Sequence, residues 1–270
     1  MFFPRIGRRR CRSRLESRCA LWRSRSQTAA MADAPPKRPE PSFPSTGPRK
    51  CIRVPDITEV PAYALDAFSI PLHYQEDLES VLIPSGLIQA RIEKLAEDIF
   101  ADYDGAMIHM LCCLKGGAGF FSDLIMYLKR CYSRRTPTVP FTFDFIRVSS
   151  YKGTESGDVK VTAVGMDFEQ LKGKHVLLVE DIVDTGRTMA ALLPELQKHG
   201  PSTLRVCSLL QKRLDNSANF IVDYLGFSVP NHFVVGYCLD YEEYFRDMDH
   251  ICLLDTKCLP KYDALAMSYK

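Results

Sequence analysis

From about residue 84 onward, the pattern of hydrophobic and polar positions switches repeatedly between helical and strand-like periods. Within residues 85–100 the apolar side chains return every three or four positions with charges between them, which predicts an amphipathic helix. These side chains are Leu87, Ile88, Ile92, Leu95, Ala96 and Ile99. Residues 107–117 form a short apolar run that ends in glycines, as expected of a strand that ends at a loop.

The same alternation continues through the middle of the chain. Residues 119–131 predict a second amphipathic helix. Residues 140–148 predict a strand, because Phe141, Phe143 and Phe145 alternate with polar residues. A polar loop over 149–158 and a strand over 159–164 follow.

The next segment has the pattern of a buried parallel strand followed by a helix. His175–Val179 is a continuous apolar run, which is typical of a strand covered on both faces. Residues 188–196 return to helical spacing, with Pro194 expected to kink or end the helix early. Residues 203–210 and 232–239 predict two further buried strands. We therefore expect an α/β fold with a mostly parallel central sheet flanked by helices.

Charge divides the chain into two unlike parts. The formal net charge is +2, but nine of the 35 basic residues and one of the 33 acidic residues lie in residues 1–30, so residues 31–270 carry a net charge of −6. Residues 31–50 contain six prolines, which is typical of a disordered segment. We expect residues 1–50 to be a basic and then Pro-rich disordered leader, and residues 51–270 to be one folded domain.

The leader leaves the compartment open. Its Arg-rich, acid-poor first thirty residues suit a mitochondrial transit peptide, or a translated upstream segment with Met31 as the working start. Without targeting, we expect a cytoplasmic protein. An Arg-rich nucleic-acid arm is disfavoured because no aromatic interleaving or basic fold follows it, so no nucleic-acid partner is expected.

Composition excludes several classes of protein. With 46% hydrophobic and 25% charged residues, the chain is neither collagen-like nor wholly disordered. It contains no apolar stretch of the roughly 18 residues that a membrane helix needs, so no membrane partner is expected. The ten cysteines are scattered except for Cys112 and Cys113, which would point to opposite faces of a strand, and we expect reduced thiols.

The most informative chemistry follows the apolar run at His175–Val179. Glu180 and Asp181 stand at the carboxyl end of the predicted strand, where ligands bind in open α/β sheets. Residues 184–188, with the sequence Asp-Thr-Gly-Arg-Thr, then turn the chain into a helix. Successive N–H groups at such a turn, with the start of the helix, bind a phosphate, and the carboxylates suit sugar hydroxyls, a magnesium ion or a proton in transit. An ordinary helix cap at Asp184 and a solvated acidic pair are the alternatives.

Five sequence blocks in order resemble the purine phosphoribosyltransferases, and specifically those that act on hypoxanthine and guanine. In chain order the blocks are CLKGG at residues 113–117, FIRVSSY at 145–151, VLLVEDIVDTGRT at 176–188, LLQKR at 209–213 and FVVGYCLDYEEYFRD at 233–247. The resemblance spans about residues 60–262. It implies a type I phosphoribosyltransferase fold, in which a small hood accompanies the central sheet.

The resemblance also implies a role for each matched residue. The loop that binds phosphoribosyl diphosphate would comprise Glu180, Asp181, Ile182, Val183, Asp184, Thr185, Gly186, Arg187 and Thr188, with Arg187 contributing only its backbone N–H. Lys115 and Gly116 would form the pyrophosphate loop, with a cis peptide between Leu114 and Lys115. Ser150 and Tyr151 would belong to a loop that closes over the transition state.

The remaining implied residues surround the base and the leaving group. Lys212 would contact the 6-oxygen of the purine, Phe233 would stack on the base and the backbone of Val234 would read its edge. Asp240 would lie on the magnesium and pyrophosphate side, and Arg246 on the pyrophosphate side. Without the resemblance, Lys115 and Arg246 read as surface charges and Phe233 as a core residue.

The implied reaction transfers phosphoribosyl from phosphoribosyl diphosphate to N9 of a 6-oxopurine base, with Asp184 as the general base. Mg²⁺ is the implied cofactor, with Glu180, Asp181 and Asp240 as its ligands. Relatives are homodimers or homotetramers, so we expect a homo-oligomer. Asn216 stands where relatives often place an arginine, which puts one secondary contact in doubt.

Two other functions remain open at this point. A non-enzymatic regulator with the same fold would be expected to replace the base carboxylate, whereas Asp184 is present. A transferase for another base is disfavoured for adenine by Lys212, while xanthine stays open.

Overall fold

The computed structural model describes residues 50–104, 106–133, 140–150, 159–214, 220 and 222–268. The predicted leader lies outside these ranges except for Lys50, and so do Tyr151 and Asn216. The strands are β1 (Ile52–Arg53), β2 (Leu78–Ile83), β3 (Ile108–Leu114), β4 (Thr142–Ser150), β5 (Val159–Val164), β6 (His175–Val183), β7 (Thr203–Lys212), β8 (Tyr224–Val229), β9 (Val234–Val235) and β10 (Ile251–Leu254). The helices are α2 (Ser85–Tyr103), α3 (Ala118–Ser133), α4 (Arg187–Gln197) and α5 (Leu259–Ser268), with short 3₁₀ helices at Leu65–Ala67, Leu72–Asp77, Phe168–Leu171 and Thr256–Cys258.

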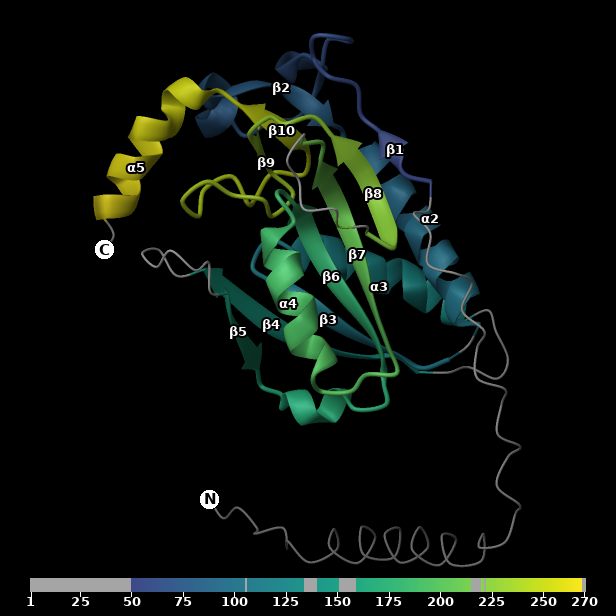
Figure 1. Ribbon diagram of the computed structural model, residues 1–270. Helices are drawn as coiled ribbons and strands as arrows, with labels where there is room; N and C mark the ends of the chain where they lie inside the picture. The colour runs from purple at the N-terminus through teal and green to yellow at the C-terminus, as the bar shows by residue number, and fades with distance from the viewer. Residues whose placement is uncertain are drawn as a thin grey trace, which may run out of the picture. The chain divides into compact units, whose positions relative to one another are not determined.

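A seven-stranded sheet in the order β1-β8-β7-β6-β3-β4-β5 forms the centre of the domain (Figure 1). All neighbouring strands are parallel except β4 and β5, which confirms the predicted mostly parallel sheet. Because the strands are parallel, β3, β6 and β7 end at the same edge of the sheet. The sheet therefore brings Leu114, Val183 and Lys212 to one side of the molecule.

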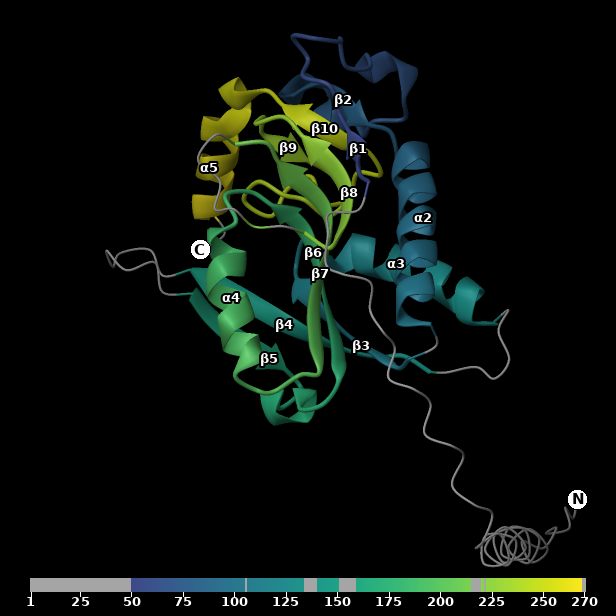
Figure 2. The ribbon, with the colours of Figure 1, turned by 45° about the vertical axis from the view of Figure 1, so that its right-hand side comes forward.

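Helices cover both faces of this sheet (Figures 1 and 2). α2 and α3 lie on one face and α4 on the other. Alternate residues of β3 show the division: Met110 and Cys112 pack in the core beneath α2 and α3, whereas Leu111 and Cys113 pack in the core beneath α4. Adjacent cysteines thus point to opposite faces as predicted, and the cysteines of the described part of the chain are free thiols.

A smaller antiparallel sheet, in the order β2-β10-β9, forms a separate layer with its own apolar cluster. This sheet is the expected hood. It corrects one prediction, because residues 232–239 form a strand of only Val234–Val235 and that strand belongs to the hood. Gly236, Tyr237 and Cys238 all have positive φ angles, so the chain turns away immediately after β9.

Two details around α4 also differ from the sequence prediction. β6 extends to Val183, so Glu180 and Asp181 lie within the last part of the strand and not after it. The helix α4 passes through Pro194 and ends at Gln197, so the predicted early break is wrong. Within the described ranges, no helix combines the length and apolarity of a membrane span.

The buried guanidinium of Arg91 joins α2 to β8 and to Lys50, which precedes β1. Its Nε donates to the carbonyl of Gly226 at 3.1 Å, and its Nη2 donates to the carbonyls of Leu225 at 2.7 Å and Lys50 at 2.8 Å. Replacement by methionine would leave these carbonyls without that donor. We expect Arg91→Met to lower the free energy of unfolding by about 2–4 kcal/mol, measured by urea denaturation.

The control for this prediction lies one turn along the same helix. Lys94 is exposed and forms an ion pair with Asp98 at 2.8 Å. Lys94→Met should change the unfolding free energy by less than about 1 kcal/mol. Equal losses for the two variants would contradict the role given to Arg91.

Candidate active site

A cavity of about 280 Å³ opens at the carboxyl end of β3 and β6. Its walls contain most of the residues predicted to bind the phosphoribosyl group. The lining residues are Cys113, Leu114, Gly116, Val148, Glu180, Asp181, Ile182, Val183, Asp184, Thr185, Gly186, Thr188 and Met189. Of the predicted loop at 180–188, Arg187 alone is outside this lining.

The loop between β6 and α4 turns the chain into the helix through a left-handed glycine. Gly186 has φ of +77°, a left-handed conformation that glycine adopts without a steric cost, and α4 begins at the next residue. The side chain that accepts from the first turn of α4 is that of Thr185, whose Oγ1 lies 3.4 Å from the N of Arg187. Asp184 instead contacts Lys212, so the ordinary alternative for Asp184, a helix cap, does not apply. The N–H groups that follow Arg187 in the first turn, and the hydroxyl hydrogens of Thr185 and Thr188, are the donors that this turn offers to a phosphate.

Glu180 and Asp181 form an acidic pair on the wall of the cavity. Burial, reinforced by the neighbouring Asp181 carboxylate, raises the pKa of Glu180 well above its usual range. The Asp181 Oδ1 atom accepts a hydrogen bond from the N–H of Ile182 at 2.9 Å. A cation or several hydroxyl donors placed between these carboxylates would offset their repulsion.

Gly116 gives the acidic pair its room. A Cβ atom at this position would lie 1.6 Å from Asp181 Oδ2 and 2.7 Å from Asp181 Cγ. The peptide between Leu114 and Lys115, one residue before this glycine, is cis, as predicted. The loop after β3 thus lies directly against the carboxylate of Asp181.

Asp184 and Lys212 meet across the ends of β6 and β7. Lys212 Nζ lies 3.3 Å from Asp184 Oδ2, and the Asp184 side chain is 54% exposed while that of Lys212 is 14% exposed. The carboxylate is accessible to a ligand, and the lysine ammonium lies within ion-pair distance of it. The structure therefore brings together the predicted proton acceptor and the predicted contact of the 6-oxygen.

A second group of charges lies beside the cavity. Arg246 Nη2 is 2.8 Å from Asp240 Oδ1 and 3.3 Å from Glu243 Oε1, and Lys115 Nζ is 2.8 Å from Glu243 Oε2. These contacts bring Lys115, Asp240 and Arg246 together, as predicted. Hydrogen bonds from Lys115 and then Arg246 hold the pKa of Glu243 below its usual range.

Glu243 is the residue that sequence reasoning missed. It joins the two predicted pyrophosphate cations, and its N–H donates to Asp240 Oδ2 at 2.9 Å. Glu242, Glu243 and Phe245 all adopt positive φ, an unusual conformation for these residue types. The sequence offers one weak signal, the acidic pair Glu242–Glu243 between two expected site residues.

The predicted base-stacking residue lies apart from the cavity lining. Phe233 is 39% exposed, and its ring meets that of Tyr241 edge-on with centroids 5.4 Å apart. Val234 is buried in β9. Ser150 is the last residue of β4, and Tyr151, the other predicted loop residue, lies outside the described residues.

The carboxylates at this site suit a magnesium ion that is bound together with a phosphorylated substrate. Among the described residues, no group of three or more His, Cys, Asp or Glu side chains gathers as a metal cage. Glu180 and Asp181 supply paired oxygens, while Asp240 is already paired with Arg246. Mg²⁺ is commonly held by one or two carboxylates together with substrate phosphates and water, so the residues fit an ion that arrives with a phosphorylated substrate.

Comparisons with known proteins agree with this geometry. The family model described as a phosphoribosyl transferase domain matches residues 84–242. Hypoxanthine-guanine phosphoribosyltransferases of Bos taurus and Homo sapiens are 49% and 48% identical to the chain over 205 residues, which is 76% of this chain and 94% of each relative. A crystal structure of hypoxanthine-guanine phosphoribosyltransferase from Schistosoma mansoni in complex with IMP superposes with a TM-score of 0.66 and 34% identity, and covers 79% of this chain and 99% of that one.

Proposed function

The chain belongs to the phosphoribosyltransferase family, and from this premise we propose that it transfers the 5-phosphoribosyl group of phosphoribosyl diphosphate to N9 of hypoxanthine or guanine. The products are IMP or GMP and pyrophosphate, so the chain is a purine-salvage glycosyltransferase. One observation carries this assignment beyond the family: the cavity that combines the acidic pair with the phosphate loop stands beside the Asp184–Lys212 pair.

The 5-phosphate would bind at the start of α4. The N–H groups after Gly186 and the hydroxyls of Thr185 and Thr188 supply donors without a charged side chain. The ribose hydroxyls would donate to Glu180 and Asp181 on the same wall. Such contacts hold the sugar in place and so contribute to catalysis through orientation.

The leaving group would be held by the second group of charges. When the bond from C1 of the ribose to the pyrophosphate oxygen breaks, the oxygen keeps the electron pair. Lys115 and Arg246 would stabilise the resulting negative charge. In the described structure both cations contact Glu243, so the incoming pyrophosphate replaces a carboxylate that is already their partner.

The base would bind between Lys212, Phe233 and Val234. As N9 of the purine bonds to C1, the proton on N7 passes to Asp184, whose exposed carboxylate lies at this subsite. The Lys212 ammonium donates to a 6-oxygen, whereas adenine would present an amino group there and leave the lysine without an acceptor. The loop that contains Ser150 and Tyr151 would close over the reacting carbon and exclude water.

We propose that Mg²⁺ accompanies the substrate, with Glu180 and Asp181 as its protein ligands and Asp240 on the pyrophosphate side. The ion would neutralise charge on the diphosphate. We expect chelation with EDTA to abolish turnover and added MgCl₂ to restore it, measured by pyrophosphate release. Full activity in EDTA after dialysis would contradict the proposal.

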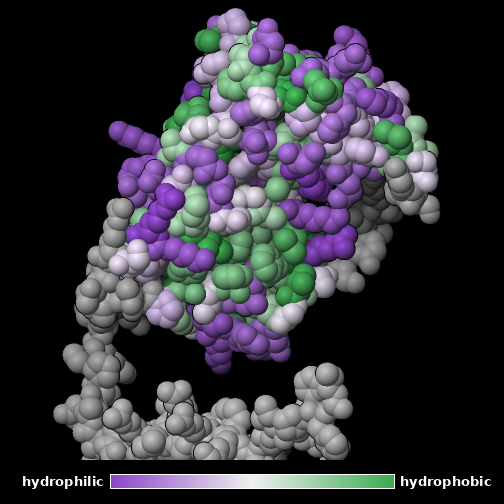
Figure 3. Space-filling view, turned by 180° about the vertical axis from the view of Figure 1, so that it is seen from behind, coloured by the Kyte–Doolittle hydropathy of each residue, from purple (hydrophilic) through white to green (hydrophobic). Residues whose placement is uncertain are grey.

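A homodimer or homotetramer is also proposed. Hydrophobic side chains gather in one area of the surface seen from behind (Figure 3). On α3 and β4, Met126 is 37% and Phe143 is 45% exposed, and Phe143 packs against Phe121. An apolar face of this kind supports association between copies. Light scattering at micromolar concentration should give at least twice the mass of one chain, and a single-chain mass would contradict it.

We propose that the protein resides in the cytoplasm, with mitochondrial import as the alternative if residues 1–30 act as a transit peptide. The scattered free thiols of the described part of the chain support a reducing compartment. Mass spectrometry of the mature N-terminus distinguishes the two, because import would remove the Arg-rich segment.

The activity itself is tested by product analysis. The full chain, incubated with phosphoribosyl diphosphate, hypoxanthine and MgCl₂, should form IMP and pyrophosphate in equal amounts by chromatography. Measurable binding of GMP without any turnover would support the non-enzymatic regulator instead.

A further inference from the structure

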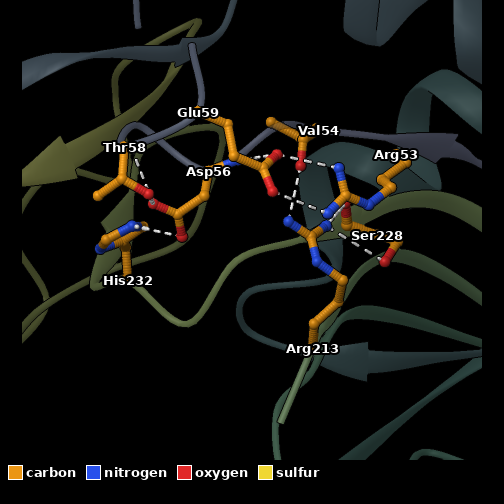
Figure 4. Close-up of polar contacts among 8 residues, drawn as sticks. All are labelled: Arg53, Val54, Asp56, Thr58, Glu59, Arg213, Ser228 and His232. Atoms are coloured by element: carbon orange, nitrogen blue, oxygen red, sulfur yellow. Dashed lines mark hydrogen bonds and ion pairs between the residues drawn. The ribbon is translucent and has the colours of Figure 1, made fainter. Parts of the chain in front are cut away.

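An extended segment far from the site in sequence lies against the residues that flank the base subsite. Residues 52–59, called here the N-terminal arm, add β1 to the outer edge of the sheet. The pairing is parallel, with Arg53 opposite Ser228, and Val54 N donates to the Ser228 carbonyl at 2.9 Å. Figure 4 shows the polar contacts that the arm then makes.

The arm ends in a tight turn organised by Asp56. The Asp56 Oδ1 atom accepts hydrogen bonds from the N–H of Thr58 at 3.0 Å and from its hydroxyl at 2.9 Å. The same carboxylate therefore has one oxygen engaged within the arm. Its other oxygen, Oδ2, points away from the turn toward His232 (Figure 4).

His232 belongs to the connection between β8 and β9. Its Nε2 lies 3.3 Å from Asp56 Oδ2. This nitrogen is shielded from solvent and has no well-aligned hydrogen-bond partner in the described ranges, so the nearby carboxylate supplies its compensation. The next residue along the chain is Phe233, the predicted stacking partner of the base.

Arg213, which directly follows β7, also binds the N-terminal arm. Its Nη2 donates to the carbonyl of Val54 at 2.8 Å, and its Nη1 donates to the carbonyl of Ser228 at 2.6 Å. Its own N–H donates to the carbonyl of Val229 at 2.8 Å. The residue before it is Lys212, so each of the two base-subsite side chains adjoins a residue held by the arm.

The chain at Phe233 is thus held from two sides. The Phe233 carbonyl accepts from the N–H of Leu254 on β10 at 3.0 Å, which fixes it to the hood. The ring of Phe233 meets the ring of Tyr241 edge-on. The contact between Asp56 and His232 joins the residue before Phe233 to the N-terminal arm, and through β1 to the central sheet.

We propose that Asp56, acting through His232, is a positioning residue for the purine subsite. It holds the connection between β8 and β9 so that the Phe233 ring faces the base beside Lys212. This inference rests on the proposed function. Neither Asp56 nor His232 touches the reacting atoms, so the chemical step and the binding of phosphoribosyl diphosphate should not depend on them.

The test uses the full chain with Asp56→Ala, His232→Ala and the double variant, assayed with hypoxanthine and with phosphoribosyl diphosphate as the varied substrate. We expect the KM for hypoxanthine to rise about threefold to tenfold in each single variant, with kcat and the KM for phosphoribosyl diphosphate unchanged. The KM for hypoxanthine of the double variant should be no higher than that of the more affected single variant, because the two substitutions remove the same contact. His232→Gln serves if His232→Ala does not fold.

Two control variants match the removed groups. Thr58→Val removes the hydroxyl contact to Asp56 while leaving the Asp56–His232 contact in place. His199→Ala breaks the pair of His199 with Glu169, which has the same 3.3 Å separation. The two histidines are similarly exposed, at 21% and 30%, but His199 follows α4 and its partner lies in a 3₁₀ helix. Both controls should keep the KM for hypoxanthine of the unsubstituted chain.

The possible results distinguish failure of the positioning role from failure of the proposed function. An unchanged KM for hypoxanthine in Asp56→Ala, or an equal rise of both KM values, would overturn the positioning role while leaving the proposed function intact. A rise in His232→Ala without one in Asp56→Ala would also overturn it, because His232 would then act without Asp56. Absence of IMP formation by the unsubstituted chain would overturn the proposed function and this inference with it.

Discussion

Replacing Asp184 by asparagine is expected to lower kcat at least about tenfold, which corresponds to about 1.4 kcal/mol of lost transition-state stabilisation. Asparagine has nearly the same shape but cannot accept the N7 proton of the purine at neutral pH. The Asp184 side chain is 54% exposed and forms no cap for α4, so its replacement should leave the fold intact. Steady-state rates and a thermal unfolding curve measure the two effects separately.

The matched control is Glu195→Gln on α4. Glu195 is a partly exposed carboxylate paired with Lys198, as Asp184 is paired with Lys212. Removal of its charge should leave kcat unchanged. Full turnover by Asp184→Asn would remove Asp184 from the catalytic role, whatever the behaviour of the control.

A single methyl group at Gly116 should have a larger effect. The Cβ atom of Gly116→Ala would lie 1.6 Å from Asp181 Oδ2, so the carboxylate must move away from the cavity wall that binds the ribose. Displacement of a positioning group by about 1 Å can cost about 100-fold in rate. The Asp181 side chain should move rather than the backbone, because it is the more flexible of the two. We therefore expect kcat/KM for phosphoribosyl diphosphate to fall by about 100-fold.

Gly86 provides the comparison for this variant. It lies in the first turn of α2, and a Cβ atom there would meet nothing within 4 Å. Gly86→Ala should keep full activity and stabilise the protein by about 0.5–1 kcal/mol, since alanine favours a helix. Equal activity of Gly116→Ala and Gly86→Ala would refute the close approach of the loop after β3 to Asp181.

The sequence predicts the central sheet well because its strands are buried on both faces. Runs such as His175–Val179 are apolar throughout, and the helices α2 and α3 show clear amphipathic spacing. The sheet strand β8 was missed, and it contains Gly226, whose Cβ would lie 2.5 Å from the carbonyl oxygen of Leu209. That close approach to β7 is a long-range property which local patterns do not reveal.

The hood is less predictable from periodicity. Residues 232–239 have the composition of a strand, but Gly236 has φ of +96° and a Cβ there would lie 2.1 Å from the carbonyl oxygen of His250. The turn is therefore imposed by a segment that lies beside it in space and follows it in sequence. The helix α5 was also missed, since Tyr262 is its one buried residue and its apolar pattern is weak.

The residues of the candidate site also differ in how far the sequence predicts them. The loop at 180–188 can be found from its residues, because acids after an apolar strand and a glycine at the start of a helix have local physical reasons. Lys115, Phe233 and Arg246 depend on the resemblance, since each has an ordinary surface or core reading. Glu243 and the contact of Asp56 with His232 depend on the tertiary structure, because their partners are distant in the sequence.

Comparison of hypoxanthine, guanine and adenine as substrates tests the central claim most directly. The measurement is kcat/KM for each base at saturating phosphoribosyl diphosphate and MgCl₂. The Asp184–Lys212 pair at the base subsite predicts turnover with hypoxanthine and guanine, and a value at least about 100-fold lower with adenine. Adenine turned over as well as hypoxanthine would contradict the account of this site.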